Sequence, residues 1–178
     1  IMKGVCDLYN LSVSQNELEH LAVDIGADVP FFINGSIQLG EGIGEKLTPL
    51  KQKVSGKYLI IIPEIVIETS WAYSQFKNGL DTSGSSINFT DFLDRKTVSF
   101  NKLKLIENDF ESIVIPTYPE IGEIKEKLCA FGAQYASLSG SGSTVFGIFN
   151  DLDKAKSAKS LFPNSVNTFI VNPIPSMF

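Results

Sequence analysis

The sequence predicts an α+β fold whose second half is a ferredoxin-like sandwich of helices on one sheet. From residue 58 onward the predicted order is strand, helix, strand, strand, helix, strand. The first strand is the continuous apolar run 58–62, which Pro63 ends and which suits a strand buried on both faces. The two middle strands enclose a turn of small residues at 139–144. This order of elements is that of a split βαβ sandwich.

The helices of this half are predicted from apolar spacing and from their end signals. Residues 118–131 form an amphipathic helix, and Gly132 follows as its C′ residue. Asn150 or Asp151 caps the next helix, before a last strand at 165–171. The inner positions of these two helices are Ile121, Ile124, Leu128, Cys129, Ala155, Ala158, Leu161 and Phe162.

Residues 68–76 are predicted to form a further helix, which carries Trp71 and Tyr73. The stretch 78–86 is rich in Gly, Ser and Asp and is typical of a mobile surface loop. Residues 88–114 are expected to be short helices joined by a polar linker.

The first part of the chain is predicted to be mainly helical. Residues 1–10 have the pattern of the end of a helix, and 14–17 are a capping box that opens a second helix, closed by Gly26. A strand is expected at 36–39, followed by a glycine-rich bend at 40–45. The predicted inner face of the second helix is Leu18, Leu21, Ala22 and Ile25.

Asp28 is the only acid in the apolar run 25–32, where it lies between Gly26 and Pro30. Burying a carboxylate is costly unless it is paired or hydrogen-bonded, and an acid in an apolar pocket can become a general base through a tuned pKa. Local evidence favours a simpler role, the N-cap of a short helix with Pro30 in its first turn. The two roles are compatible, because a cap residue can also face a ligand.

Composition bounds the class of protein. The 178 residues are 43% hydrophobic, enough for a real core, and the net charge of −5 argues against nucleic acid or an anionic membrane as the main partner. Neither a membrane span nor a cleavable signal peptide is expected. Cys6 and Cys129 have no metal-ligand spacing, and each is predicted to be a buried thiol, which suits a reducing, cytoplasmic setting.

Two glycine loops were tested as phosphate-binding motifs. Residues 35–40 have Walker A glycine spacing, but Glu41 stands where the lysine belongs. Residues 139–144 lack the third glycine of a dinucleotide fingerprint and lie between two strands. The second loop is left with two interpretations, an anion-binding nest of backbone N–H groups or a plain Gly-Ser hairpin. His20, the only histidine, is expected on the surface, and no metal site is expected.

Four blocks together resemble the GHMP kinase superfamily: 26–32, 40–50, 108–111 and 137–146. Within it, the chain is similar to a member of the non-mevalonate isoprenoid pathway, from about Gly4 to about Val171. The resemblance implies a kinase that transfers the γ-phosphate of ATP to the 2-hydroxyl of a cytidyl-linked sugar alcohol. ATP and Mg²⁺ are the implied cofactors of the full-length enzyme, and neither is expected to bind tightly to this segment.

The resemblance also implies how the chain is divided. Residues 1–50 correspond to a remnant of the N-terminal kinase domain that carries Asp28, and residues 51–178 to the GHMP C-terminal domain. Family members carry a catalytic lysine and a glycine-rich ATP loop in a preceding region, and neither motif is in these 178 residues. The chain alone is therefore expected to be inactive, and an uncovered apolar face is expected to favour self-association.

The resemblance assigns roles residue by residue. Asp28 matches the catalytic acid, which accepts or orients the substrate hydroxyl proton. Tyr73 matches an aromatic that stacks on cytosine, and Pro63 and Thr69 lie near it on the strand-to-helix path. The phosphate-proximal turn is Ser139, Gly140, Ser141 and Gly142.

Two other interpretations stay open at this point. One is another GHMP enzyme, such as a homoserine or mevalonate-type kinase, and a substrate panel on a full-length enzyme would decide it. The other is a non-catalytic ferredoxin-like binding module that keeps the motifs as scaffold. Calorimetry with a cytidine nucleotide distinguishes the second interpretation from the others, since a non-catalytic scaffold is expected to bind no cytidine nucleotide.

Overall fold

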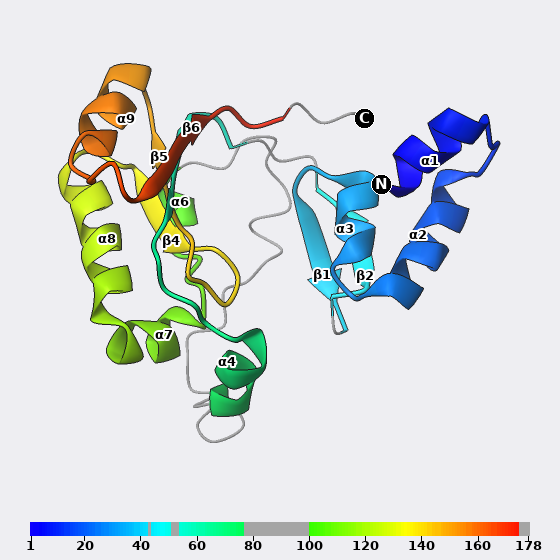
Figure 1. Cartoon of the computed structure of the whole chain (residues 1–178), viewed down its shortest axis with the longest axis horizontal. Helices are drawn as coiled ribbons and strands as arrows, with labels where there is room; N and C mark the ends of the chain where they lie inside the picture. The colour runs from blue at the N-terminus through cyan, green and yellow to red at the C-terminus, as the bar shows by residue number, and fades with distance from the viewer. Residues whose placement is uncertain (43, 51–53, 77–99, 175–178) are drawn as a thin grey trace. The chain divides into compact units, whose positions relative to one another are not determined.

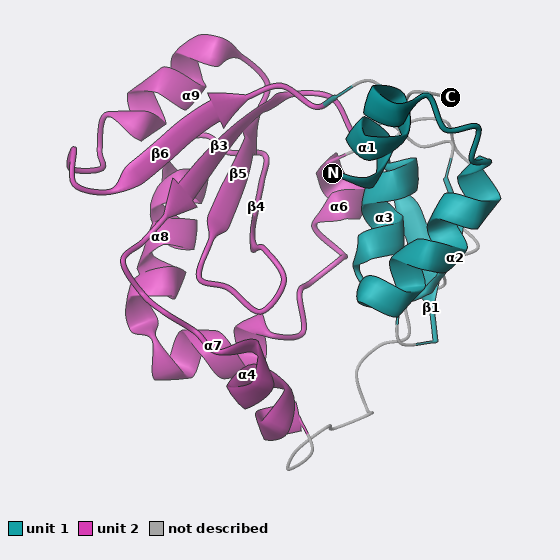
Figure 2. Ribbon diagram, turned by 45° about the vertical axis from the view of Figure 1, so that its right-hand side comes forward, with its two compact units in different colours: residues 1–53, 174–178 teal, residues 54–173 magenta. Residues whose placement is uncertain are grey.

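A computed structural model describes residues 1–42, 44–50, 54–76 and 100–174 and divides the chain into two compact units (Figure 2). Unit 1 comprises Ile1–Lys53 and Ile174–Phe178, and unit 2 comprises Val54–Pro173. The loop expected at 78–86 and the start of the segment 88–114 lie outside the described residues. The assignment of residues 1–50 to an N-terminal kinase domain stays a prediction.

The described residues of unit 1 form three helices and a pair of antiparallel strands. The helices are α1 (Met2–Tyr9), α2 (Gln15–Ile25) and α3 (Val29–Asn34), and the strands are β1 (Gln38–Glu41) and β2 (Lys46–Pro49). Its buried core is small and consists of Leu18, Ala22 and Ile33.

The capping box at the start of α2 is confirmed. The Ser14 hydroxyl accepts a hydrogen bond from the Glu17 backbone N–H, and the Glu17 carboxylate accepts one from the Ser14 N–H at 2.9 Å. The hydrogen bond from the Ser14 side chain, and then that from its backbone, lower the pKa of Glu17 below its ordinary value.

Two expectations for unit 1 are corrected. Leu21 and Ile25, predicted to face inward from α2, are 54% and 65% exposed, because the small core reaches only Leu18 and Ala22 on that helix. The strand expected at 36–39 begins at Gln38 and pairs with β2, a strand that the sequence analysis missed. The first two residues of the expected glycine-rich bend, Gly40 and Glu41, belong instead to β1, which pairs antiparallel with β2.

Unit 2 is one antiparallel sheet with helices packed against it (Figure 1). The strand order is β4-β5-β3-β6, and every neighbouring pair is antiparallel. This topology confirms the predicted ferredoxin-like sandwich. The elements are β3 (Lys57–Ile62), α4 (Thr69–Phe76), α6 (Phe100–Leu103), α7 (Glu111–Thr117), α8 (Pro119–Ala130), β4 (Tyr135–Leu138), β5 (Val145–Phe149), α9 (Leu152–Lys159) and β6 (Asn167–Val171).

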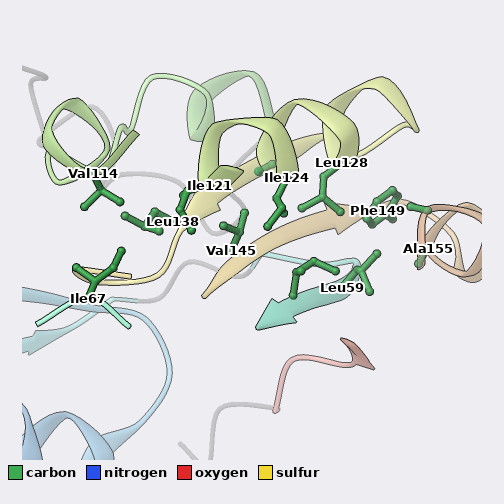
Figure 3. Packing of buried hydrophobic residues seen from close by; sticks show 13 residues of the cluster. Leu59, Ile67, Val114, Ile121, Ile124, Leu128, Leu138, Val145, Phe149 and Ala155 are labelled. Carbon is green, nitrogen blue, oxygen red and sulfur yellow. The ribbon is translucent and has the colours of Figure 1, made fainter. Parts of the chain in front are cut away.

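The core of unit 2 lies between the sheet and helices α8 and α9. Figure 3 shows Ile121, Ile124 and Leu128 of α8 pointing toward the strands, where they meet side chains such as Val145 and Phe149. All five are buried. Burial of such aliphatic and aromatic side chains is the main stabilising contribution to a domain of this size.

Two burial predictions for unit 2 are wrong. Strand β3 is not buried on both faces: Leu59 and Ile61 are fully buried, but Ile62 is 38% exposed. Its two neighbours run antiparallel to it, and such sheets commonly bury one face only. Cys129 is exposed on α8 and Cys6 is half-buried, so neither is a buried thiol.

Two local expectations for end signals and surface groups can be checked. Asp151, and not Asn150, caps α9, and its carboxylate accepts from the Lys154 N–H at 2.8 Å. His20 is exposed, as predicted. Within the described ranges, no helix has the length and apolarity for a membrane span.

Candidate functional site

The turn at 139–144 joins β4 to β5 and takes the shape that its glycines permit. The Ser139 N–H donates to the Thr144 carbonyl at 2.8 Å, and the Gly142 N–H donates to the Ser139 carbonyl at 3.0 Å. Gly140 and Gly142 have φ of 56° and 97°, in the left-handed region that favours glycine. A Cβ on Gly142 would lie 3.0 Å from Ile67 Cδ1 and 3.2 Å from Leu138 Cδ1, so a side chain here would require these two core residues to shift.

Asn108 holds this turn from outside. Its Nδ2 donates to the Leu138 carbonyl at 2.9 Å and to the Gly140 carbonyl at 2.8 Å. Its Oδ1 accepts from the Phe110 N–H at 3.0 Å. One side-chain amide therefore connects the end of β4, the turn and the start of the segment that leads into α7.

Glu111, the first residue of α7, is buried and holds the end of β4. Its Oε1 accepts from the Ser137 hydroxyl at 3.0 Å and from the Leu138 N–H at 2.8 Å. Its Oε2 pairs with the half-buried Lys125 of α8. A buried carboxylate is tolerated when it is paired and hydrogen-bonded in this way.

Helix α4 reaches the same turn through its first residue. The hydroxyls of Thr69 and Ser141 lie 3.1 Å apart, within hydrogen-bond distance. The structure thus brings together two of the residues predicted from the sequence. Pro63, the third residue predicted on this path, is half-buried directly after β3, and no contact places it at the turn.

An open pocket of about 500 Å³ lies next to this cluster. The Phe110 ring contacts Tyr73 edge-on, with ring centroids 5.0 Å apart, and Phe76 at 4.8 Å. Tyr73 is 59% exposed, so much of its ring is open to a ligand. The lining residues are Tyr73, Phe76, Glu107, Asn108, Asp109 and Phe110.

Asp28 lies in unit 1, at the N-cap position of α3, with Pro30 in the first turn as predicted. Its side chain makes no capping hydrogen bond; the turn is closed instead by the Val29 N–H, which donates to the Gly26 carbonyl at 3.0 Å. The expectation that this acid is buried in an apolar pocket is wrong, because the side chain is exposed. Pro30 and Ile33 are the residues that α3 buries.

Three residues of this arrangement, Asn108, Phe110 and Glu111, were not predicted as site residues. They belong to the block 108–111, which carries part of the family resemblance. A polar-aromatic-acidic block directly before a helix is a usable signal, since Asn commonly bonds the backbone two residues on. The groups that Asn108 and Glu111 contact, at the end of β4 and in the turn, have no local sequence signature.

The comparisons with known proteins agree with this fold. Residues 93–165 match the family model described as GHMP kinases C terminal. A 4-diphosphocytidyl-2-C-methyl-D-erythritol kinase of Geobacter metallireducens is 40% identical over 174 residues, which are 96% of this chain and 59% of that protein.

Solved structures give the same result. The crystal structure of a 4-(cytidine 5'-diphospho)-2C-methyl-D-erythritol kinase matches with a TM-score of 0.75 and 25% identity, over 95% of this chain and 60% of that one. A homoserine kinase from Cytophaga hutchinsonii matches with a TM-score of 0.63 at 17% identity, over 96% of this chain and 61% of that one, which shows the fold alone.

The predicted resemblance is confirmed, because residues 93–165 match the family model of the GHMP kinase C-terminal region and the fold matches a solved kinase structure. Within that class, the chain is similar along nearly its whole length to 4-diphosphocytidyl-2-C-methyl-D-erythritol kinase. It spans 59% of the length of the Geobacter metallireducens relative.

Proposed function

We propose that these residues are part of an ATP-dependent kinase that phosphorylates the 2-hydroxyl of 4-diphosphocytidyl-2-C-methyl-D-erythritol. The observation that carries the proposal is the 40% identity, over 96% of this chain, to a kinase named for that substrate. The reaction belongs to non-mevalonate isoprenoid biosynthesis and takes place in the cytoplasm. The proposed reaction has two small-molecule partners, the cytidyl alcohol and ATP.

Phosphoryl transfer depends on positioning and charge neutralisation more than on covalent chemistry. In the proposed mechanism, Asp28 accepts or orients the proton of the substrate hydroxyl, and its exposed position leaves it accessible to a ligand. The turn at 139–142 lies beside the phosphates, with two residues in the left-handed conformation that can turn backbone N–H groups to one side.

Mg²⁺ would neutralise phosphate charge when ATP is bound. In the described part of the chain there is no group of three His, Cys, Asp or Glu side chains that could hold an ion. Mg²⁺ is usually held in kinases by substrate phosphates and one or two carboxylates, and the phosphates of ATP are expected to supply most of its ligands.

The aromatic pocket is the proposed site for cytosine. The Tyr73 side chain is mostly exposed, and its ring packs edge-on with the ring of Phe110. The carboxylates of Glu107 and Asp109 also line the pocket, and either can accept a hydrogen bond from the exocyclic amine of cytosine. Thr69 ties the helix that carries Tyr73 to the glycine turn.

Tyr73→Ala is expected to weaken the binding of cytidine diphosphate by roughly 5- to 150-fold, since stacking on one base contributes about 1–3 kcal/mol. Tyr73→Phe keeps the ring and is expected to bind within about threefold of the unchanged protein. Isothermal titration calorimetry on the natural polypeptide that contains these residues measures both. Equal affinity for the alanine variant would exclude the stacking role.

The reaction itself is tested by ³¹P NMR of the natural polypeptide with ATP, Mg²⁺ and a panel of alcohols. The expected result is phosphorylation of the cytidyl-linked substrate and not of homoserine or mevalonate. The 178 residues assayed alone are expected to give no turnover, because they contain no glycine-rich ATP loop of the family pattern. Turnover of homoserine instead would overturn the substrate assignment.

We also propose that the isolated chain self-associates through unit 1. Helices α1, α2 and α3 expose Leu8, Ile25 and Phe32 at 73%, 65% and 75%. Clusters of exposed apolar side chains favour association in water. Size-exclusion chromatography with light scattering is expected to show a mass that rises with concentration, and a constant monomer mass would contradict the proposal.

A further inference from the structure

We infer that Asn108 is a positioning residue that holds the Ser139–Thr144 turn in its working shape and joins it to the aromatic pocket. Its side-chain amide has two N–H donors and one carbonyl acceptor, and all are used. The two donors bond the carbonyls of Leu138 and Gly140, which flank Ser139 on either side. Asn108 thus holds the turn through the backbone carbonyls on either side of its first residue, Ser139.

The acceptor links the same side chain to the pocket. Oδ1 bonds the N–H of Phe110, whose ring packs against both Tyr73 and Phe76. Asn108 itself also lines the pocket. A planar ligand that presses on the Tyr73–Phe110 pair therefore acts on a segment that is bonded directly to the glycine turn.

Glu111 makes this role of Asn108 separable from general stability. The Glu111 carboxylate bonds the Ser137 hydroxyl and the Leu138 N–H, so it holds the end of β4 independently of the Asn108 side chain. Glu111 meets Asn108 only through the backbone, where its N–H donates to the Asn108 carbonyl at 2.8 Å. Loss of the Asn108 donors leaves that anchor in place and frees the residues after it. The expected effect is confined to the turn.

Asn108→Asp tests the inference with little change of shape. The aspartate keeps the acceptor for Phe110 but replaces two donors with a carboxylate oxygen that faces two carbonyl oxygens. Amide hydrogen exchange, followed by NMR on the full chain, is expected to become at least tenfold faster at Ser139 and Gly142. Exchange at Leu59 and Ile61 in β3 is expected to stay within twofold. Asn164→Asp makes the same charge change at an exposed position of unit 2 and is the control.

Two outcomes would overturn the inference: unchanged exchange in the turn, or equal acceleration in the turn and in β3. If the variant does not fold, the unchanged protein still decides the matter. Its Asn108 side-chain NH₂ signals are expected to exchange at least tenfold more slowly than those of Asn164, and equal rates would refute the double hydrogen bond.

A kinetic measurement, which rests on the proposed function, shows whether the positioning serves catalysis. In the natural polypeptide, Asn108→Asp is expected to raise the KM for ATP about tenfold, and the KM for the cytidyl alcohol is expected to rise as well, because Asn108 also lines the aromatic pocket. A purely structural loss would lower the apparent kcat with both KM values unchanged, and this result would refute a catalytic purpose. Absence of any kinase activity would refute the proposed function alone, because the exchange measurements do not depend on it.

Discussion

Asp28→Asn is expected to lower phosphorylation of the cytidyl alcohol by about 10²–10⁴-fold in the natural polypeptide, the usual contribution of a general base. The amide keeps the size of the side chain but cannot take up a proton. The side chain is exposed and makes no capping hydrogen bond, so the change is expected to leave the stability of unit 1 nearly unaltered. Steady-state rates with ATP and Mg²⁺ measure the effect.

Asp24→Asn is the matched control for this prediction. Asp24 is an exposed acid near the end of α2, and its replacement changes the net charge of the same unit by the same amount. Its rate is expected to stay within about twofold of the unchanged protein. An Asp28→Asn enzyme that retains more than a third of its activity would remove this residue from the mechanism.

Glu111→Ala is expected to reduce the free energy of unfolding of unit 2 by about 3 kcal/mol. The substitution removes Glu111, the buried partner of the ion pair with Lys125. The change leaves the Leu138 N–H and the Ser137 hydroxyl without their acceptor. Each buried donor left without a partner adds to the loss of stability. Urea denaturation followed by circular dichroism measures the free energy directly, and the melting temperature should fall by roughly 10 °C.

Glu126→Ala provides the comparison for Glu111. Glu126 is an exposed acid on α8, and its removal is expected to change the free energy of unfolding by less than about 0.5 kcal/mol. Similar stabilities of the two variants would show that the Glu111 network contributes nothing.

Much of the fold could be predicted because its signals are local. The capping box at Ser14, the amphipathic spacing of α8 and the order of strands in unit 2 each depend on residues close together in the sequence. The short strand β2 was missed because KLTP carries no run of apolar or β-branched residues that would mark it. Pairing with β1 across the glycine-rich bend makes it a strand.

The burial of single residues was harder to predict than the elements. Ile62 continues an apolar run but lies on the less covered face of the sheet, and Ile25 continues an apolar stripe beyond the reach of its small core. Asp28 has apolar neighbours in the sequence, yet α3 buries only Pro30 and Ile33 among its apolar residues and leaves the acid exposed. Which neighbours face inward depends on tertiary packing, and local sequence does not determine it.

The candidate site was predicted in part. The Thr69–Ser141 contact and the exposed ring of Tyr73 agree with the expected surroundings of a ligand, whereas Pro63 stays without a contact that places it there. The bonds of Asn108 and Glu111 to β4 and the turn join segments far apart in the sequence, so no spacing rule could reveal them.

One segment, residues 107–110, walls the aromatic pocket and also carries the amide that grips the glycine turn. On the proposed assignment of this pocket to cytosine, a redesign for a bulkier purine ring can enlarge the pocket either through this segment or through Phe76. Lengthening this segment would move Asn108 and thereby disturb the glycine turn, which is proposed to lie beside the phosphates at the other end of the ligand. Replacing Phe76 on α4 with a smaller residue enlarges the pocket from the side of that helix and leaves the bonds of Asn108 intact. Laboratory selection for a changed base preference is therefore expected to yield substitutions at Phe76.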